Sequence, residues 1–557
     1  MKPLPEMPTR EMPEMPNRKR SIKDKFVKKK LPKLASKVLP ELPHKEEISF
    51  KIEPLTEIPT FPDVKKQEIN FKYPLLKPYA YAHIYWDDKL KELIYYLEEP
   101  KLTADEKKIL MLLEDGIKEL INISYLSLGK GEKIIEYLEK NIKVLLSELR
   151  ITPTQSSYLK LMYYIYRDFV GLGKIEPLMH DYFIEDIECN GSKFPLYIVH
   201  RKFRNLKTNI VFKETPELAG FVEKLAQRAG RYVSYATPLL DGALPDGSRV
   251  NATFTEDVSS RGPTFTIRKF TKTPWPPTQL IKLNTISPEA LAYLWMAVEY
   301  GKNIMVIGGT GSGKTTLLNA LTFFIPPQAR IVSIEDTREL NLEHDNWLPS
   351  VAREGVGLAN LVGQKYGEVT MFNLLKESFR QNPDYVIVGE IRGEEAYVLF
   401  QGMASGHPSF GTMHANSVDT MIKRLETKPI DLSPSLVEVM DVVVSITATK
   451  RAGKNVRRVK QIDEVIKIDE AGNTINVPFQ WDVNGDKLIY SAESHIFKKL
   501  VYQQGIKKED IFAEWKKRTM LLIGMYNKGM FDFHSVQTIV NAYYKSPEET
   551  LAKFGIR

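Results

Sequence analysis

The stretch "NIMVIGGTGSGKTTLLNAL", residues 303–321, decides the fold of this chain. An apolar run, Ile304–Ile307, leads into a loop that fits G-x-x-x-x-G-K-[ST], and an amphipathic helix is expected from Thr315 to Phe324. In such a loop the glycines let backbone N–H groups wrap phosphate oxygens, and the helix N-terminus adds positive potential. The sequence therefore predicts a nucleotide-binding loop between a buried strand and a helix of an α/β domain.

This loop carries most of the predicted contacts with nucleotide. We expect Lys314 to reach the β and γ phosphates of ATP, and the Thr315 hydroxyl to ligate Mg²⁺. A glycine-rich turn that binds no phosphate is the alternative, and the Lys-Thr pair with both flanking elements in place disfavours it. The predicted nucleotide-binding residues of the loop are Gly308, Gly309, Thr310, Gly311, Ser312, Gly313, Lys314, Thr315 and Thr316.

Carboxylates end two further apolar runs. "ARIVSIED" ends in Glu335 and Asp336, and "PDYVIVGEIRG" carries Gly389 and Glu390 near its end. A single acid at a strand end is often only a cap or a salt-bridge partner, but two of them in a chain with a phosphate loop favour chemistry. In an ATPase one carboxylate orients a metal-bound water and another accepts the proton of the attacking water. We predict Glu390 as the general base or water-orienting group, and Glu335 as a group that positions metal and water.

Two histidines occur in "GHPSFGTMHANS", residues 406–417. The part "PSFGTMH" can form the next strand of the same parallel sheet, which would bring His414 to the edge that carries Lys314 and Glu390. A metal site would need a third ligand, which neither a cysteine nor an i, i+4 histidine spacing supplies, so zinc is disfavoured. We predict that His414 senses the γ phosphate, and that His407 matters less.

The composition is that of a soluble protein with several domains. The chain has 557 residues, of which 43% are hydrophobic and 27% charged, and its net charge is +8. We expect no membrane span and no signal peptide, because no apolar run reaches about 18 residues and the N-terminus is polar and proline-rich. Cys189 is the one cysteine, which excludes an internal disulfide framework and fits a reducing cytoplasm.

Basic residues crowd the segment 18–37 near the N-terminus. The favoured interpretation is a solvated tail, and the sharper alternative is a tether to anionic lipid or to an acidic partner. No aromatic stacking pattern accompanies the charges, so nucleic acid is not an expected partner. The cations are Arg18, Lys19, Arg20, Lys23, Lys25, Lys28, Lys29, Lys30, Lys33 and Lys37.

Composition and periodicity predict five segments. Residues 1–75 are expected to be a disordered, Pro- and Lys-rich tail. A helical bundle is expected over residues 76–170, because a capping box, Thr103 with Glu106, and apolar residues at helical spacing occur there. The first of these apolar residues are Leu90, Leu93, Ile94 and Leu97. The other predicted segments are an N-terminal α/β domain, 171–270; a Pro-rich linker, 271–286; and an ATPase domain, 287–557, with a C-terminal appendage from about 455.

The phosphate loop, "IVSIEDTREL", "PDYVIVGEIRG" and "GHPSFGTMHANS" occur in an order that resembles the secretion ATPases of type II and type IV systems. That family's Walker A, Asp-box, Walker B and His-box motifs match Gly308–Thr315, Glu335–Asp336, Gly389–Glu390 and His407–His414. The likeness spans roughly residues 80 to 450 and is closest to the archaeal branch, which drives pili, archaella and related filaments. Many bacterial type II members carry a tetracysteine zinc insert, from which this chain departs.

The resemblance implies a RecA-like P-loop core and a homohexamer of two-domain subunits with ATP between the domains. It also implies a cytoplasmic protein, peripheral at the membrane, that works with a polytopic inner-membrane platform protein. Arg249 and Arg268 match arginines of the family's N-terminal domain that reach nucleotide phosphates. For each of them, a surface or structural arginine is an equally weighted alternative.

The expected function is ATP hydrolysis coupled to domain motion, which would power assembly of an extracellular filament from the cytoplasmic face. A hexameric DNA-handling ATPase is the first alternative, and it predicts turnover stimulated by nucleic acid. A nucleotide-dependent scaffold without turnover is the second, and the intact carboxylates argue against it.

Overall fold

The computed structural model describes residues 50–53, 59, 61, 64–120, 132–270, 273–353, 355, 365–451, 454–469 and 472–556. Within these ranges no helix is long and apolar enough to cross a membrane. The basic segment 18–37 lies outside them, so its disorder and its lipid contact stay predictions. Contacts between Cα atoms divide the chain into two compact units, one of which is built around Glu99–Glu176 and the other around Pro177–Arg557.

The first unit is helical. Its helices α2 and α4 pack together through buried residues that include Leu113, Ile117, Leu138 and Ile142. The predicted capping box at Thr103 is confirmed: the Thr103 N–H donates to Glu106 Oε2 (2.8 Å), and the Glu106 N–H donates to Thr103 Oγ1 (3.2 Å). The helices are α2 (Ala104–Leu120), α4 (Glu132–Glu148), α5 (Gln155–Ile165), the π-helical Tyr166–Val170 and the 3-10 turn Gly173–Ile175.

The bundle predicted over residues 76–170 is wrong in its first part, which forms strands. β2 (Ala80–Asp87) and β3 (Glu92–Glu98) are antiparallel neighbours, and β1 (Asn70–Leu76) pairs with β2 although residues up to 75 were expected to be disordered. One face of β3 is buried through Leu93, Tyr95 and Leu97, and Ile94 is buried on the other face, so the apolar residues only mimic a helical period. Leu90 is exposed in the turn before β3, where the Asp87 carboxylate accepts its N–H.

These strands complete a nine-stranded sheet of order β1-β2-β3-β6-β5-β4-β9-β8-β7. The α/β domain expected from residue 171 therefore recruits strands that precede the helical unit in sequence. Helix α7 (Thr215–Arg228) packs on the sheet through Phe221, whose ring contacts Phe212 and Phe265. The remaining elements are the 3-10 turn Lys66–Glu68, α6 (Glu176–Met179), β4 (Ile184–Cys189), β5 (Pro195–His200), β6 (Arg204–Val211), β7 (Leu239–Ala243), β8 (Arg249–Thr253) and β9 (Thr264–Arg268).

A second nine-stranded sheet forms the ATPase core, in the order β12-β11-β13-β14-β10-β15-β16-β17-β18. The first six of these strands are parallel, so their carboxyl ends share one edge, as in other open α/β sheets. The last three are antiparallel. The parallel strands are β10 (Ile304–Ile307), β11 (Ile331–Glu335), β12 (Trp347–Val351), β13 (Tyr385–Ile391), β14 (Ser409–Met413) and β15 (Val442–Arg451); the others are β16 (Lys454–Asp469), β17 (Gly472–Asp482) and β18 (Lys487–Tyr490).

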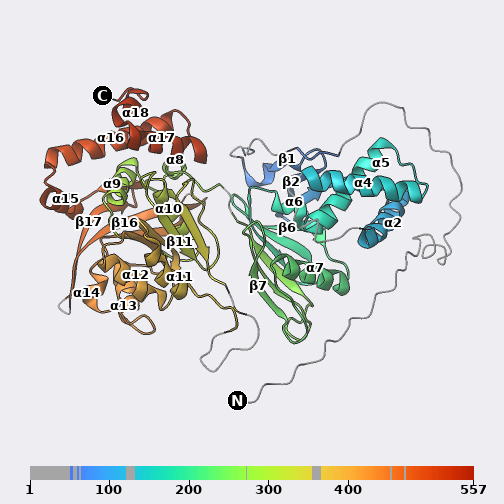
Figure 1. The fold of residues 1–557 in the computed structure, drawn as a ribbon. Coiled ribbons are helices and arrows are strands. Elements are labelled where there is room, and N and C mark those ends of the chain that lie inside the picture. Colours follow the sequence, from blue (N-terminus) through green and yellow to red (C-terminus); the bar gives the residue numbers. More distant parts are fainter. Residues whose placement is uncertain are drawn as a thin grey trace, which may run out of the picture. The chain divides into compact units, whose positions relative to one another are not determined.

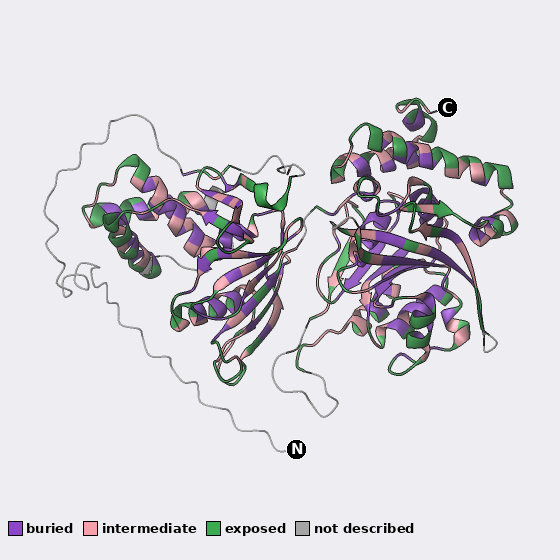
Figure 2. Ribbon diagram, turned by 180° about the vertical axis from the view of Figure 1, so that it is seen from behind, coloured by how far each residue is buried: buried purple, intermediate pink, exposed green. Residues whose placement is uncertain are grey.

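Helices cover both faces of this sheet (Figure 1), and the strands between them are largely buried (Figure 2). One hydrophobic core joins the sheet to α9, α10 and the C-terminal helices, and a second joins its other face to α11–α14. The first set is α8 (Pro277–Lys282), α9 (Pro288–Glu299), α10 (Lys314–Thr322), α15 (His495–Gln504), α16 (Lys508–Asn527), α17 (Phe533–Lys545) and α18 (Pro547–Ala552). The second is α11 (Met371–Ser378), the 3-10 turn Phe379–Gln381, α12 (Glu395–Ala404), α13 (Val418–Glu426) and α14 (Pro434–Val437).

The region expected as an appendage from about residue 455 is an integral part of this core. Strands β16 and β17 extend the sheet, and apolar residues of the C-terminal helices share the core of α9 and α10. The fully buried Glu464 carboxylate on β16 accepts hydrogen bonds from Tyr293 of α9 (2.8 Å) and from Ser494 Oγ (2.5 Å), the residue that caps α15. β15 and β16 form an antiparallel hairpin, so the chain runs back along β15 and adds strands to the same sheet. This pairing explains why residues predicted as an appendage belong to the core.

Candidate functional site

The phosphate loop connects β10 to α10 and depends on glycine at two kinds of position. Gly311 and Gly313 have φ of +69° and +100°, in the left-handed region that other residues rarely adopt. Gly308 is required by packing instead, because a Cβ there would lie 2.3 Å from the carbonyl oxygen of Ile446 on β15. The loop therefore passes close against the neighbouring strand.

Lys314 opens α10 and is largely buried. Its Nζ donates to the carbonyl oxygen of Gly309 (3.1 Å) and lies 3.3 Å from His414 Nε2. Burial lowers the pKa of Lys314, while the nearby carboxylates of Glu390 and Glu339 oppose that shift. The ammonium group is thus held across the loop, at the edge where the parallel strands end.

Glu390 and His414 meet at the same edge, from neighbouring strands. Glu390 lies on β13, His414 follows β14 directly, and Glu390 Oε1 is 2.8 Å from His414 Nε2. Burial lowers the pKa of His414, and the positive charge of Lys314 adds to this effect, so the neutral imidazole is favoured. Glu390 Oε1 has no hydrogen-bond partner among the described residues, so the two side chains are close without a formed hydrogen bond. The structure therefore brings Lys314, Glu390 and His414 together.

Glu335 lies at the end of β11 with its side chain buried. Its Oε1 accepts the N–H groups of Glu339 (2.8 Å) and Leu340 (2.9 Å), and its buried Oε2 has no hydrogen-bond partner among the described residues. Burial raises the pKa of this carboxyl to about 7. Gly389 makes room for it, because a Cβ at 389 would lie 3.0 Å from Glu335 Cγ. One carboxylate oxygen is thus free for a metal-bound water or a cation.

His407 is not part of this cluster, because it precedes β14 whereas His414 follows it. Its N–H donates to the carbonyl oxygen of Gly402 (3.0 Å), and its ring packs edge-on against Phe379 at 5.1 Å between centroids. The two histidines of the quoted stretch therefore stand at opposite ends of one strand and do not form a pair of ligands.

Arg249 and Arg268 are register partners on β8 and β9 of the N-terminal sheet. Each is paired with a carboxylate of that sheet: Arg249 with Asp241 (2.9 Å) and Arg268 with Asp186 (3.1 Å). These ion pairs agree with a structural arginine, which was one of the two interpretations. That either guanidinium reaches nucleotide phosphates stays a prediction.

Three arginines at this edge were not singled out from the sequence. Arg392, two residues after Glu390, donates from Nε to Glu390 Oε2 (3.0 Å), and Arg424 of α13 donates to the carbonyl oxygen of His414 (2.8 Å). Arg457 reaches over from β16 to the carbonyl oxygen of Gly311 (3.1 Å). The short spacing within "GEIRG" could have signalled Arg392, whereas only the pairing of β15 with β16 brings Arg457 to the loop.

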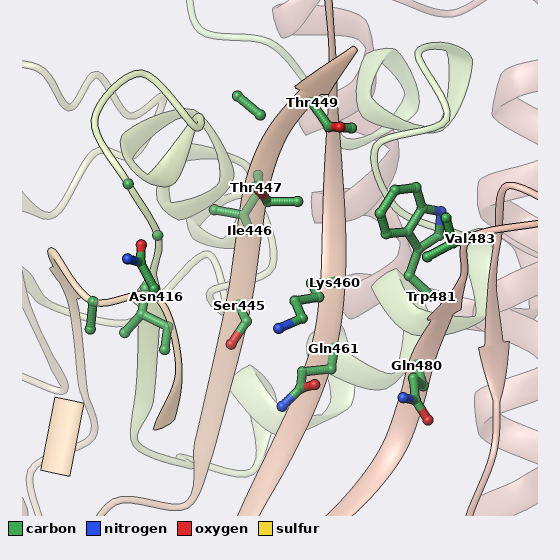
Figure 3. Close-up of a pocket in the computed structure, with 15 residues that line it drawn as sticks. Asn416, Ser445, Ile446, Thr447, Thr449, Lys460, Gln461, Gln480, Trp481 and Val483 are labelled. Carbon is green, nitrogen blue, oxygen red and sulfur yellow. The ribbon is translucent and has the colours of Figure 1, made fainter. Parts of the chain in front are cut away.

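A cavity of about 480 Å³ opens beside the first two glycines of the loop. Its polar lining includes Asn416 after β14 and Ser445 and Thr447 on β15. Figure 3 shows Lys460 and Gln461 of β16 beside that strand, and Gln461 is the register partner of Ser445. The Ser445 hydroxyl is buried and has no hydrogen-bond partner among the described residues. The space next to the phosphate loop is therefore polar and lined mostly by neutral groups.

Comparison with known proteins places the chain in a family. The family described as "Type II/IV secretion system protein" matches residues 170–481, more than half of the chain. The chain belongs to that family. The resemblance to secretion ATPases drawn from the four motifs is thereby confirmed, and so is the α/β fold with a P-loop core.

Relatives of this type II/IV secretion family member occur in archaea and bacteria. "Uncharacterized protein MJ0900" of the archaeon Methanocaldococcus jannaschii is 37% identical over 472 residues, which are 83% of this chain and 82% of that protein. "Type IV secretion system protein PtlH" of Bordetella pertussis is 34% identical over 40% of this chain and 73% of its own length. Among solved structures, the VirB11 ATPase from the type IV secretion system of Brucella suis is 24% identical over 52% of this chain and 92% of its own, but the TM-score is 0.27 and no argument rests on it.

Proposed function

We propose that this chain is a Mg²⁺-dependent ATPase that works as a homohexameric motor for assembly of a pilus-like filament or for related secretion. One observation carries the proposal: at one edge of the sheet, Lys314 Nζ lies 3.3 Å and Glu390 Oε1 lies 2.8 Å from His414 Nε2. Membership of the type II/IV secretion family supports ATPase activity.

The proposed chemistry assigns each group a step. Lys314 would stabilise the negative charge that develops on the phosphates, which is the larger part of catalysis in phosphoryl transfer. Glu390 would orient the attacking water and accept its proton. His414 would carry the state of the γ phosphate to the strands on either side, because it contacts Glu390 and lies next to Lys314.

The residues present fit a magnesium ion bound with ATP. Thr315 stands in the first turn of α10, and the buried Glu335 Oε2 lacks a hydrogen-bond partner in the described part of the chain. Hydroxyl and carboxylate oxygens are ligands that Mg²⁺ accepts, usually with water between ion and protein. The ion would supply charge neutralisation on the phosphates, and Glu335 would hold a water of its shell.

The proposal also covers the cellular location of the protein and its membrane partner. A cytoplasmic position at the membrane and a polytopic platform protein as partner are proposed because relatives carry the names of secretion-system components. Which filament or substrate is served is not assigned. A DNA-translocating ATPase stays the alternative, and turnover that rises on addition of DNA would favour it.

Two variants test the activity. Lys314→Ala should abolish hydrolysis and weaken ATP binding, because it removes the buried cation of the loop.

Glu390→Gln should still bind ATP but turn over more slowly by roughly 10²–10⁴, as for a lost acid/base group. Lys302→Ala, before β10 at the other end of that strand, is the matched control. Near-normal turnover by purified Lys314→Ala protein would refute the site.

A further inference from the structure

Arg392 binds the carboxylate that the proposed mechanism needs for water. Its Nε lies 3.0 Å from Glu390 Oε2, and its Nη2 contacts the same oxygen. The other oxygen, Oε1, is 2.8 Å from His414 Nε2. Arg392 therefore engages Oε2, whereas the buried Oε1 lies near the imidazole without a hydrogen-bond partner among the described residues. Both guanidinium nitrogens converge on one carboxylate oxygen, so the pair lacks the fork geometry with one nitrogen on each oxygen.

The Arg392 side chain is largely exposed, whereas its backbone is fixed by hydrogen bonds. The N–H groups of Arg392 and Gly393 both donate to Glu395 Oε1 (2.6 and 2.8 Å) at the start of α12, which anchors this turn. The side chain itself is 59% exposed, and Asp336, at 3.7 Å, is its other acidic neighbour. Ion pairs of such exposed groups are weak and are readily exchanged for a more highly charged partner.

The charges around Glu390 indicate what that partner would be. Charged and polar groups adjoin one another along this edge. Lys314 lies beside His414 and His414 beside Glu390, while Arg392 lies between Glu390 and Asp336. The γ phosphate of ATP carries more negative charge than one carboxylate, and a guanidinium matches its oxygens in a bidentate way. ADP lacks that group and would leave the pair of Arg392 with Glu390 intact.

We infer that Arg392 is a positioning residue that holds Glu390 in a resting pair and exchanges it for γ-phosphate oxygens when ATP binds. Release by Arg392 frees Glu390 Oε2 for the attacking water only when a γ phosphate is present. The inference deepens the proposed function and rests on it, since it assumes that ATP occupies the loop 308–315.

A double-mutant cycle on binding tests the exchange without any turnover. The affinities of the wild type, Glu390→Gln, Arg392→Gln and the double variant are measured for the imido analogue of ATP, which is not hydrolysed, and for ADP. Glu390→Gln should bind the analogue more tightly by on the order of three- to tenfold, because Arg392 no longer has to leave a carboxylate. Arg392→Gln should weaken analogue binding by a similar factor, and in the double variant the gain from Glu390→Gln should disappear.

Two further variants separate this role from a general loss of charge. Arg392→Lys keeps the charge without the planar fork and should recover part of the analogue affinity. Arg380→Gln removes an exposed arginine that pairs with Glu377 and should leave every affinity unchanged. Effects of the two single changes that simply add, or equal effects on ADP and on the analogue, would overturn the inference.

The same measurements distinguish failure of the inference from failure of the proposed function. If Lys314→Ala binds the analogue as tightly as the wild type, the nucleotide site itself is wrong, and both fall. If Lys314→Ala loses binding but the cycle shows no coupling, ATP binds at the loop and only the exchange by Arg392 is refuted.

Discussion

Glu390 and His414 show how single residues acquire a role from their neighbours. His414 Nε2 lies 2.8 Å from Glu390 Oε1 and 3.3 Å from Lys314 Nζ, so a ligand that moved either group would change the surroundings of the imidazole. A group can couple ligand to conformation only if it interacts differently with the two ligand states, and the γ phosphate is the difference between ATP and ADP.

His414→Ala should therefore separate ATP binding from output. We expect ADP affinity to stay within about twofold and the ATPase rate to fall by roughly tenfold or more, less than the roughly 10²–10⁴ expected for loss of the acid/base group itself. His407→Ala is the control, because it lies at the other end of β14. ADP titration and steady-state turnover check the prediction. Equal effects of the two substitutions would mean that the histidines only support the strand, and zinc lost on either change would favour a metal site.

Asp463 offers a prediction about pH and stability. It is buried on β16, Gln461 donates to its Oδ1 (2.8 Å), and burial raises its pKa from 3.8 to about 6. The folded state thus binds this proton more tightly than the unfolded state, so the contribution of Asp463 to the free energy of unfolding falls as pH rises from about 4 to about 6 and is level above that.

Asp463→Asn keeps the acceptor and removes the charge. The variant should gain at most about 3 kcal/mol over the wild type above pH 6, the free energy that corresponds to two pKa units. The gain should shrink as the pH approaches 4. Thermal unfolding at pH 4.5 and 7.5 measures it, with the exposed Asp345→Asn as the control. A gain of equal size at both pH values would contradict burial of the charged carboxyl as its cause.

At the scale of elements, the contact between the phosphate loop and β15 fixes the shape of the nucleotide site. Gly308 lies against the Ile446 carbonyl, whereas the nearest atom to a Cβ at Gly309 would be 4.0 Å away, on Asn416. Of these adjacent glycines of one motif, packing therefore constrains the first and leaves room for a Cβ at the second.

Gly308→Ala should destabilise the nucleotide-free protein by about 1–3 kcal/mol, the usual cost of overpacking, and should distort the loop. Gly309→Ala should leave the melting temperature of the nucleotide-free protein unchanged, because its Cβ meets no atom closer than 4.0 Å. Differential scanning calorimetry without nucleotide compares the two variants directly. A Gly308→Ala protein as stable as the wild type would show that β15 yields to the loop.

At the scale of the whole molecule, the N-terminal region contributes to folding further upstream than its composition indicates. Phe50 is buried, its N–H donates to Glu139 Oε1 (2.8 Å), and its ring contacts Tyr79. Phe61 packs against Phe183 at 4.7 Å between ring centroids. A domain boundary at residue 75 would therefore separate Phe50 and Phe61 from their aromatic partners and divide β1 near its end.

Deletion of residues 1–48 should leave the melting temperature and the ATPase rate near those of the full chain. Deletion of 1–70 should lower both, since burying an aromatic side chain such as Phe50 contributes several kcal/mol.

If the basic segment 18–37 is a lipid tether, both deletions should weaken binding to vesicles that contain phosphatidylserine at low salt. Unchanged vesicle binding would leave an inert tail. Full stability of the 1–70 deletion would show that these aromatic contacts add little.

The sequence by itself determined what depends on local order. The apolar run, the glycines and the Lys-Thr pair of residues 303–321 lie within one short stretch, so they predict strand, loop and helix together. The strand after "GHP" and the capping box at Thr103 were predicted for the same reason, because neighbours in sequence make them. Parallel strands also end at one edge, which placed His414 beside Lys314 and Glu390 before their distances were known.

Only the tertiary structure decided what depends on partners far apart in the chain. Residues 80–98 form strands because β3 pairs with β6, more than a hundred residues later in the chain. A buried strand face with one further buried residue, Ile94, on the opposite face gives an apolar spacing that also fits a helix. Arg457 reaches the phosphate loop, and Glu464 ties the C-terminal helices to the core, through the pairing of β16 with β15. Long-range strand pairing leaves no local pattern in the sequence, because each strand satisfies its hydrogen bonds with a partner that its own residues do not specify.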